Sequence, residues 1–490
     1  MDRREFLRGV GYGMAGVSLW GCGRGAEYAG HKGGSERPNI VFILADDLGY
    51  RELGCYGQKK IRTSNIDRLA AEGMRFTQAY SGSPVCAPSR CTLMTGLHSG
   101  HGQVRDNKQV GGADMWKLGA TEGGQWPLAD GTMTVAKLLQ QKGYATGAFG
   151  KWGLGRVGTT GDPQRQGFDH FFGYICQRQA HTYYPNHLWQ DGKVVRIPEN
   201  EGGRESVYAH DRITEEALEF IRTNRDRRFF CYVPFTIPHV ALQVPEDSLA
   251  EYRGRWPDPP YDGSRGYVPH PHPRACYAAM VTRMDRDVGR IMTLLSELGL
   301  ERDTLVIFSN DNGPTHSGGA DSTFFESAGE LRGLKGSVYE GGIRVPMIAR
   351  WPGRIAAGAT SDHVCAFWDF LPTMAELIGE TAWANGSSSR DGVSEMDGIS
   401  YLATLQGKTN KQKQHRSLYW ELKGQQAVRM GNWKGVRKKP NRKLELYDLK
   451  NDVGEQNDVA TQHPETVAAI KRLMRTGRSE SKVFPLKKKG

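Results

Sequence analysis

The fold of this chain is constrained most by a unit that recurs along it. Each unit has an amphipathic helix, a Gly or Asn that stops it, an apolar strand and then a polar residue. The helices are predicted at 135–142, 211–224 and 277–299, and the strands at 39–47, 144–150, 228–239 and 304–313. Because strands buried on both faces are apolar throughout, the pattern predicts an α/β fold with a large, mostly parallel sheet sandwiched by helices.

Polar residues stand at the ends of these strands, where such folds bind their ligands. They are Asp46, Asp47, Lys151, His239, Asp311 and Asn312. Three carboxylates and an amide are hard oxygen ligands, suited to Ca²⁺ or Mg²⁺ rather than zinc. Either acidic pair taken alone is more simply explained as turn residues or caps, so both interpretations stay open on these residues.

A second distinctive segment is "SPVCAPSRCTLMTG" at 83–96. Pro88 favours a helix that begins near Cys86. The N–H groups of that first turn attract an anion, and Arg90 adds a planar fork of donors suited to sulfate or phosphate oxygens. Cys86 would then stand at an anion-binding helix start, although buried packing and a thiolate nucleophile are the alternatives for a cysteine there.

Composition narrows the class of protein. A hydrophobic content of 38% suits a globular protein with one large and one smaller domain. The net charge of +11 is spread along most of the chain, which fits either solubility or an anionic substrate. No zinc-finger, helix-turn-helix or base-stacking pattern indicates a nucleic-acid partner. The eight cysteines form no C-x-x-C pair, so neither a zinc ribbon nor a thioredoxin motif is indicated.

The first residues are interpreted as an export signal. "MDRREFLRG" carries paired arginines before an apolar stretch that ends at Cys22, which is typical of a twin-arginine signal and similar to a lipoprotein cleavage box. We therefore expect a signal at 1–22, a linker at 23–36 and a periplasmic or cell-surface protein, with a lipid anchor at Cys22 as an open alternative. No later apolar run is long enough to span a membrane.

The pattern of predicted secondary structure changes near residue 405. Short alternating or aromatic strands are predicted at 415–422, 425–438 and 443–452, followed by a helix at 463–477. This pattern predicts a small α+β subdomain at 406–490, in which an antiparallel sheet packs with one helix, after a main domain at 37–405.

The segment "CAPSRCTLMTG" matches the C-x-P-S-R-x-x-x-T-G signature of the type I sulfatases, and the resemblance extends from "RPNIVFILADDLGY" to "ELYDLKND". It implies an alkaline-phosphatase-like fold whose catalytic domain is 37–405. It also implies hydrolysis of sulfate esters, here expected on a sulfated sugar or oligosaccharide. In this family a separate maturation enzyme oxidises the cysteine to formylglycine, whose hydrate carries two hydroxyls on one carbon: one attacks sulfur, and the other lets the adduct collapse.

The resemblance also implies roles for single residues. It makes Asp46, Asp47, Asp311, Asn312 and the modified Cys86 ligands of calcium, with magnesium less expected. Lys151 and Lys335 resemble the lysines that hold sulfate oxygens. Arg90 resembles the arginine that steadies the formylglycine, and His239 the histidine that meets the sulfate and the leaving oxygen.

One position departs from the family pattern. Many relatives read G-K-W-H-L-G where this chain has Gly153, so the base for the collapse step is open. His181 is a candidate replacement or, as we favour, a sugar contact. Five further residues are either candidates for the same pocket or loop residues satisfied by local partners: His98, His101, Arg105, Asp106 and Asn107. Two rival functions remain, a phosphate mono- or diesterase on this scaffold and a homologue that binds sulfated glycans without turnover.

Overall fold

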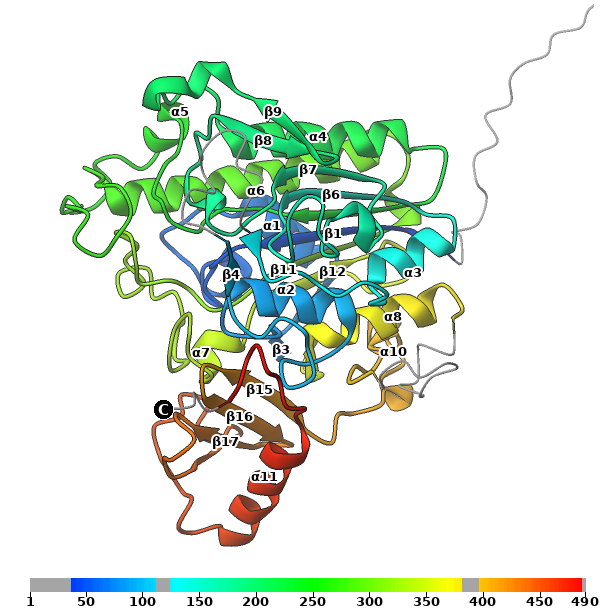
Figure 1. The fold of residues 1–490 in the computed structure, drawn as a ribbon, viewed down its shortest axis with the longest axis vertical. Coiled ribbons are helices and arrows are strands. Elements are labelled where there is room, and N and C mark those ends of the chain that lie inside the picture. The colour runs from blue at the N-terminus through cyan, green and yellow to red at the C-terminus, as the bar shows by residue number, and fades with distance from the viewer. Residues whose placement is uncertain (1–36, 112–123, 381–395, 487–490) are drawn as a thin grey trace, which may run out of the picture.

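The computed structural model describes residues 37–111, 124–380 and 396–486. The expected export signal, Cys22 and the linker lie outside these residues. A large sheet forms the centre of the molecule, and helices cover both of its faces (Figure 1). Among the described residues, no helix combines the length and the apolar character needed to cross a bilayer.

The large sheet has ten strands, and its centre is parallel. From edge to edge they are β13 (Ala359–Ser361), β2 (Met74–Phe76), β12 (Met347–Arg350), β11 (Thr304–Asn310), β1 (Asn39–Ala45), β10 (Phe229–Pro234), β6 (Ala145–Lys151), β7 (His170–Tyr174), β8 (His187–Gln190) and β9 (Lys193–Arg196). The five strands from β11 to β7 are parallel, whereas β12 and β8 pair antiparallel to their inner neighbours. The predicted mostly parallel sheet is confirmed.

The central strands are apolar throughout because each face meets a separate hydrophobic core. On β1, Val41 and Ile43 point to one core while Ile40 and Phe42 point to the other. The first core includes residues of α1 (Ser64–Ala71), α4 (Ala209–Thr223) and α6 (Pro273–Glu297); the second includes residues of α2 (Cys86–Thr95), α3 (Val135–Gln141) and α8 (Phe370–Leu377). The predicted helices correspond to α3, α4 and α6.

The remaining elements are short. They are β3 (Ala79–Tyr80), β14 (Cys365–Ala366), β4 (Gln109–Val110), β5 (Gly124–Gln125), α5 (Glu246–Leu249), α7 (Glu340–Ile343) and α10 (Leu402–Leu405). The ribbon of β4 and β5 lies close to Cys86 in the fold, since Gln109 and Gln125 line the same pocket as that residue.

The C-terminal residues form a second, smaller sheet at one end of the molecule (Figure 1). Its antiparallel strands are β15 (Leu418–Leu422), β16 (Gln425–Met430), β17 (Trp433–Arg437) and β18 (Glu445–Asp448). Helix α11 (Pro464–Thr476) packs on one face through Ile470 and Met474. The other face presents Trp420, which packs with Trp368 and Tyr80 of the large domain. The predicted small antiparallel sheet with one helix is thus confirmed.

Candidate active site

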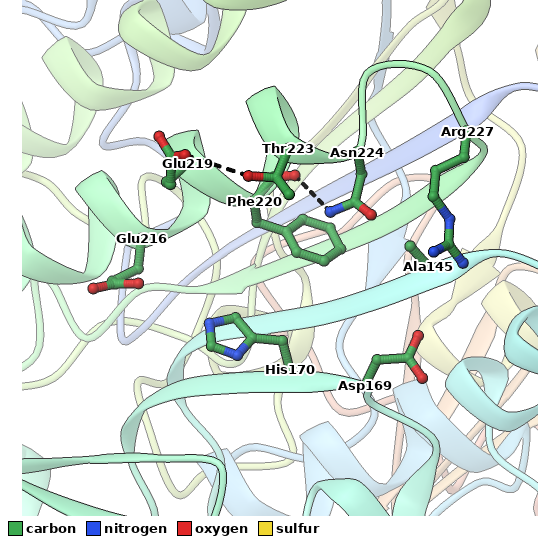
Figure 2. A pocket seen from close by; sticks show the side chains of 9 residues that line it. All are labelled: Ala145, Asp169, His170, Glu216, Glu219, Phe220, Thr223, Asn224 and Arg227. Atoms are coloured by element: carbon green, nitrogen blue, oxygen red, sulfur yellow. Dashed lines mark hydrogen bonds between the residues drawn. The ribbon is translucent and has the colours of Figure 1, made fainter.

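Two pockets lie near opposite ends of β6. The amino-end pocket, of about 450 Å³, is bordered by Ala145, His170 and residues from the end of α4 (Figure 2). The Cys86 pocket, of about 170 Å³, lies at the other edge of the sheet. Its lining residues are Cys86, Asn107, Gln109, Gln125, Gln177, Arg178, His181, His239, Tyr267 and Lys335. The predicted functional residues concentrate at this second, smaller pocket.

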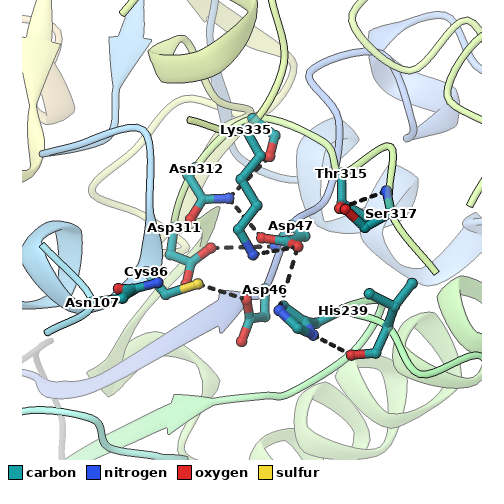
Figure 3. A network of polar contacts seen from close by, with 12 residues as sticks. Asp46, Asp47, Cys86, Asn107, His239, Asp311, Asn312, Thr315, Ser317 and Lys335 are labelled. Atoms are coloured by element: carbon teal, nitrogen blue, oxygen red, sulfur yellow. Dashed lines mark hydrogen bonds and ion pairs between the residues drawn. The ribbon is translucent and has the colours of Figure 1, made fainter. Parts of the chain in front are cut away.

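Three buried carboxylates form the centre of the site. Asp46 and Asp47 follow β1, and Asp311 follows β11, the strand beside it (Figure 3). Asp47 has a left-handed φ of 67°, so the chain turns there and both neighbouring carboxylates can serve one site. The backbone N–H of Asp47 donates to Oδ1 of Asp311 at 3.3 Å. In a straight strand the two neighbouring carboxylates would point to opposite faces of the sheet, so the turn is needed to bring both to one site.

Arg90 holds this group of carboxylates together. Its Nε and Nη2 donate to Oδ2 of Asp311 at 3.1 and 2.8 Å, and Nη2 also donates to Oδ2 of Asp46 at 3.2 Å. Nη1 donates to the carbonyl of Lys151. With its donors directed to these acceptors, Arg90 does not present its fork to an anion in the pocket. The expectation that the fork binds sulfate oxygens directly is therefore wrong for this structure, because two buried carboxylates need the same donors.

The two lysines pair with separate carboxylates. Lys151 donates from Nζ to Oδ2 of Asp46 at 2.5 Å, and Lys335 donates to Oδ2 of Asp47 at 2.7 Å. Lys151 is only 1% exposed, whereas the side chain of Lys335 is 19% exposed and lines the Cys86 pocket. Burial would raise the pKa of Asp46, but the charges of Lys151, His239 and Arg90 together lower it.

The site has the ligands and the charge for a hard cation. Asn312 donates from Nδ2 to Asp47 at 2.7 Å, yet its buried Oδ1 has no hydrogen-bond partner among the described residues. Burial and the neighbouring Asp46 raise the pKa of Asp311 to about 7, which shows that the carboxylates are crowded. An ion coordinated by oxygen would satisfy the amide and relieve the crowding. The residues present thus fit Ca²⁺ or Mg²⁺.

Cys86 is the first residue of α2, as the proline in its first turn predicts. Its thiol donates to Oδ1 of Asp46 at 3.4 Å, and the residue is 1% exposed. Burial, together with the carboxylates of Asp311 and Asp46, raises the pKa of the thiol. Because a nucleophilic cysteine needs a lowered pKa, this environment disfavours a thiolate mechanism. The next N–H of the helix start, that of Ala87, is taken by Oδ1 of Asn107 at 2.8 Å.

His239 faces the cluster from the segment after β10. Its Nδ1 bonds to the carbonyl of Val240, so the proton of the neutral ring is on Nδ1 and the lone pair of Nε2 points to Asp47, 3.6 Å away. Burial, followed by the charges of Lys335 and Lys151, lowers the pKa of His239. The ring can accept a proton at Nε2 and release it to a group in the pocket.

His181 lies against His239 at the pocket wall. The two rings stack with centroids 4.9 Å apart, and His181 also contacts the ring of Tyr267 at 5.2 Å. His181 therefore lines the pocket beside His239, where either a sugar contact or a proton carrier could act. The structure therefore brings His181 to the predicted pocket.

The five candidate residues of the loop at 98–107 do not all reach the same site. Asn107 lines the Cys86 pocket, but the remaining four do not. Nδ1 of His101 contacts Asp397 at 2.9 Å, and Nε2 of His98 lies 3.4 Å from the same residue. Arg105 donates to Glu421 of the small sheet at 3.1 Å and to Ser479. The expectation of sugar contacts from His101 and Arg105 in this pocket is wrong, because both side chains are bound to distant parts of the chain.

Sequence reasoning missed an amide wall on the pocket, formed by Asn107, Gln109, Gln125 and Gln177, of which only Asn107 had been considered. Gln177 follows β7 at the same edge of the sheet as the other site residues. Gln177 belongs to no motif, but the glycine at position 153 indicates that another side chain occupies the space beside it. A Cβ atom on Gly153 would lie 1.9 Å from Nε2 of Gln177, so the glycine leaves room for this amide.

Comparison with known proteins gives a consistent result. A sequence model of the family described as "Sulfatase" matches residues 38–380, and that of the "N-sulphoglucosamine sulphohydrolase, C-terminal" family matches 334–480. The chain is 33% identical to arylsulfatase A of Homo sapiens over 89% of its length and 87% of the relative's. It is 28% identical to the N-acetylgalactosamine-6-O-sulfatase of Bacteroides thetaiotaomicron over 90% and 93%.

A solved structure resembles most of the chain. The crystal structure of Ps i-CgsB in complex with k-i-k-neocarrahexaose superposes with a TM-score of 0.72 at 28% identity, covering 90% of this chain and 92% of that one.

Proposed function

The chain belongs to the sulfatase family and has its alkaline-phosphatase-like fold, and on that premise we propose that it removes sulfate from sulfated carbohydrates by means of a formylglycine made from Cys86. The observation that carries the proposal is the position of Cys86, whose thiol contacts the buried carboxylate of Asp46 at the pocket that Lys335 and His239 line. A relative named N-acetylgalactosamine-6-O-sulfatase and a related structure in complex with k-i-k-neocarrahexaose support a sugar substrate.

The proposed roles follow from the contacts. Asp46, Asp47, Asp311 and Asn312 would hold calcium, with magnesium less favoured, and the ion would supply positive charge near the sulfate. Once oxidised to formylglycine and hydrated, Cys86 would carry two hydroxyls on one carbon, one suited to attack on sulfur and one to the release of sulfate. Lys335 and Lys151 offset the negative charge of the sulfuryl oxygens.

Arg90 and His239 complete the proposed machinery. Arg90 fixes Asp46, Asp311 and the carbonyl of Lys151 in one arrangement, and thereby positions the helix start at Cys86. Nε2 of His239 would take up a proton and pass it to the departing sugar oxygen, while the carbonyl of Val240 fixes the ring through Nδ1.

The test is release of free sulfate from singly sulfated galactose and N-acetylgalactosamine, each sulfated at position 4 or 6. The enzyme is co-expressed with a formylglycine-generating enzyme and assayed with calcium. We expect one regioisomer to be cleaved and the Cys86→Ala variant to be inactive. Mass spectrometry of the Cys86 peptide confirms the aldehyde. No release of sulfate from a protein that carries the aldehyde would contradict the proposal for these sugars.

Two rivals are decided by the same experiment. A phosphate mono- or diesterase would cleave the matched phosphate esters faster than the sulfates, although Cys86 with Pro88 and Arg90 favours sulfate. A module that binds without turnover would retain the sulfated sugars after calcium is removed and release no sulfate.

We further propose that the protein is exported and that 37–405 carry the catalysis, with 406–490 as a supporting subdomain. The paired arginines in 1–22 support export, and Cys22 is the candidate site of a lipid anchor. Cell fractionation of the full chain and of a variant with both arginines replaced by lysine tests this. Equal distribution of the two proteins would contradict it.

A further inference from the structure

The Cys86 pocket is lined by two chemically different sets of side chains. One set carries reacting and charged groups, among them Cys86, His239 and Lys335. The other set, the amide wall, consists of Asn107, Gln109, Gln125 and Gln177. Amide side chains are neutral and offer both donors and acceptors, as the hydroxyl groups of a sugar do. Sulfate oxygens only accept hydrogen bonds, so the ammonium group of Lys335 suits them better.

Two amides of this wall are buried and carry atoms without hydrogen-bond partners among the described residues. Gln177 is 4% exposed and Gln125 is 2% exposed. Neither Nε2 nor Oε1 of Gln177, nor Nε2 of Gln125, has a hydrogen-bond partner within the described parts of the chain. Buried polar atoms are almost always hydrogen-bonded, and an unmet one is costly unless something else satisfies it. These atoms therefore indicate a ligand that the pocket is built to receive.

The position of Gln177 is set by its surroundings. Trp152 and Gly153 donate from their backbone N–H groups to the carbonyls of Tyr174 and Ile175 at 2.9 and 3.2 Å, so the segments after β6 and β7 run side by side. Gln125 accepts from the backbone N–H of Gln177 at 2.7 Å through its Oε1. The Gln177 amide then fills the space in which any side chain at 153 would lie. The free amide groups are thus held in place before a ligand binds.

We propose that the amide wall, with Gln177 as its principal member, binds hydroxyl groups of the sugar ring next to the sulfate ester and selects a hydroxyl-rich alcohol over an aryl or steryl one. The inference rests on the proposed function and deepens it. An aryl or steryl alcohol would leave these buried amides without partners, whereas a sugar hydroxyl can donate to Oε1 and accept from Nε2. Gln177 is a specificity-determining residue here, because it has no group that can transfer a proton near neutral pH.

The test compares two esters in two variants. The substrates are N-acetylgalactosamine 6-sulfate and 4-nitrophenyl sulfate, which has no ring hydroxyls. Gln177→Met keeps the length of the side chain and removes its hydrogen bonds. The matched control is Gln179→Met in the same segment, because the Gln179 amide is buried and donates to the carbonyl of His187 at 3.0 Å but does not line the pocket.

For Gln177→Met we expect kcat/KM to fall about 10- to 100-fold with the sugar sulfate, mostly through KM, and less than threefold with the aryl sulfate. Its Tm should stay the same or rise, since two unpaired buried atoms are lost. Gln179→Met should lower Tm and leave the ratio of the two activities unchanged. An equal loss with both esters, or a lower Tm with an unchanged ratio for Gln177→Met, would overturn the proposal.

A binding measurement separates this proposal from the proposed function. Calorimetry of the Cys86→Ala protein with N-acetylgalactosamine 6-sulfate requires no turnover. Adding Gln177→Met should raise Kd at least about tenfold even if the wild type, with its aldehyde confirmed, cleaves neither ester. In that case the proposed function fails and the amide wall stands. Unchanged binding, or no binding by either protein, contradicts the amide wall.

Discussion

The two pockets near the ends of β6 differ in how their polar groups are satisfied. In the amino-end pocket two polar side chains have local partners: Thr223 donates to Glu219 at 3.3 Å, and Asn224 donates to the carbonyl of Phe220 at 2.8 Å (Figure 2). The Cys86 pocket is smaller, yet Nε2 of Gln125 and both amide atoms of Gln177 lack hydrogen-bond partners among the described residues. Unmet hydrogen-bonding groups therefore mark the functional pocket better than volume does.

The difference has a physical origin in the sheet. Parallel strands bring their carboxyl ends to one edge, where Asp46, Lys151 and Asp311 meet in the interior. At the other edge, the polar side chains around β6 lie at the surface, as exposed Glu219 and Arg227 show. Charges in the interior interact more strongly than charges in water, so mutations at the two ends should differ widely in effect.

The largest difference in activity is expected between two variants that each remove one cationic side chain, one from each pocket. Lys335→Ala removes a charge that contacts Asp47 at 2.7 Å and lines the Cys86 pocket. We expect kcat/KM for sulfate ester hydrolysis to fall about 10²- to 10³-fold, the usual loss of a group that stabilises transition-state charge. Arg227→Ala in the amino-end pocket should remain within twofold of the wild type. Similar losses of kcat/KM in both variants would contradict the difference proposed between the two pockets.

The next largest difference between the two pockets is expected when calcium is removed by a chelator. Calcium that binds the folded chain alone stabilises it by about 2.7 kcal/mol at 100 times its Kd. We expect EDTA to lower Tm and calcium to restore it. Asn312→Leu, which removes the unpartnered Oδ1, should reduce this increment, whereas Glu219→Gln in the amino-end pocket should not. A calcium increment that survives Asn312→Leu unchanged would contradict the ligand set.

A smaller effect is expected at Gly153. Gly153→Ala places a Cβ where Nε2 of Gln177 lies, so it should displace the amide and reduce kcat/KM for the sugar sulfate by about tenfold. The control is Gly158→Ala, because Gly158 has a similar φ of 76° but no atom within 4 Å of the added Cβ. Both variants carry the backbone strain, and only the first should change the sugar-to-aryl ratio. Equal sugar-to-aryl activity ratios in the two variants would show that the overlap between the new Cβ and the Gln177 amide does not cause the loss.

The smallest predicted effect concerns pH. Burial, with the charges of His239, Lys151 and Lys335, lowers the pKa of His181 to about 2. The unfolded chain, with a histidine pKa near 6.5, then binds more protons, so this contribution to stability is present above pH 6.5 and is lost as the pH falls toward 2. The loss is on the order of 1 kcal/mol at pH 5.5. Denaturant unfolding of His181→Gln should show a smaller decrease between pH 7.5 and pH 5.5 than the wild type.

The sequence was sufficient for the parts of the fold and site that depend on local pattern. Apolar runs located β1, β6, β10 and β11, and the polar residue after each strand led to Asp46, Lys151, His239 and Asp311. The short edge strands β2, β13, β8 and β9 were not predicted, because their pairing depends on distant neighbours. His101 and Arg105 were misplaced for the same reason, since their partners Asp397 and Glu421 lie far along the chain. Gln177 was missed because a lone amide carries no motif.

The wide separation of the site residues along the chain has a consequence for the timing of synthesis. Arg90 and Asp311 are 221 residues apart, and Asp47 and Lys335 are 288 apart, so no short fragment contains the site. At about 5–20 residues per second, the ribosome needs on the order of 10–40 s after Arg90 to reach Asp311. During that interval the Cys86 thiol cannot be enclosed by its final neighbours. A modifying enzyme would have access to the nascent chain in this interval, before the finished sheet buries the thiol.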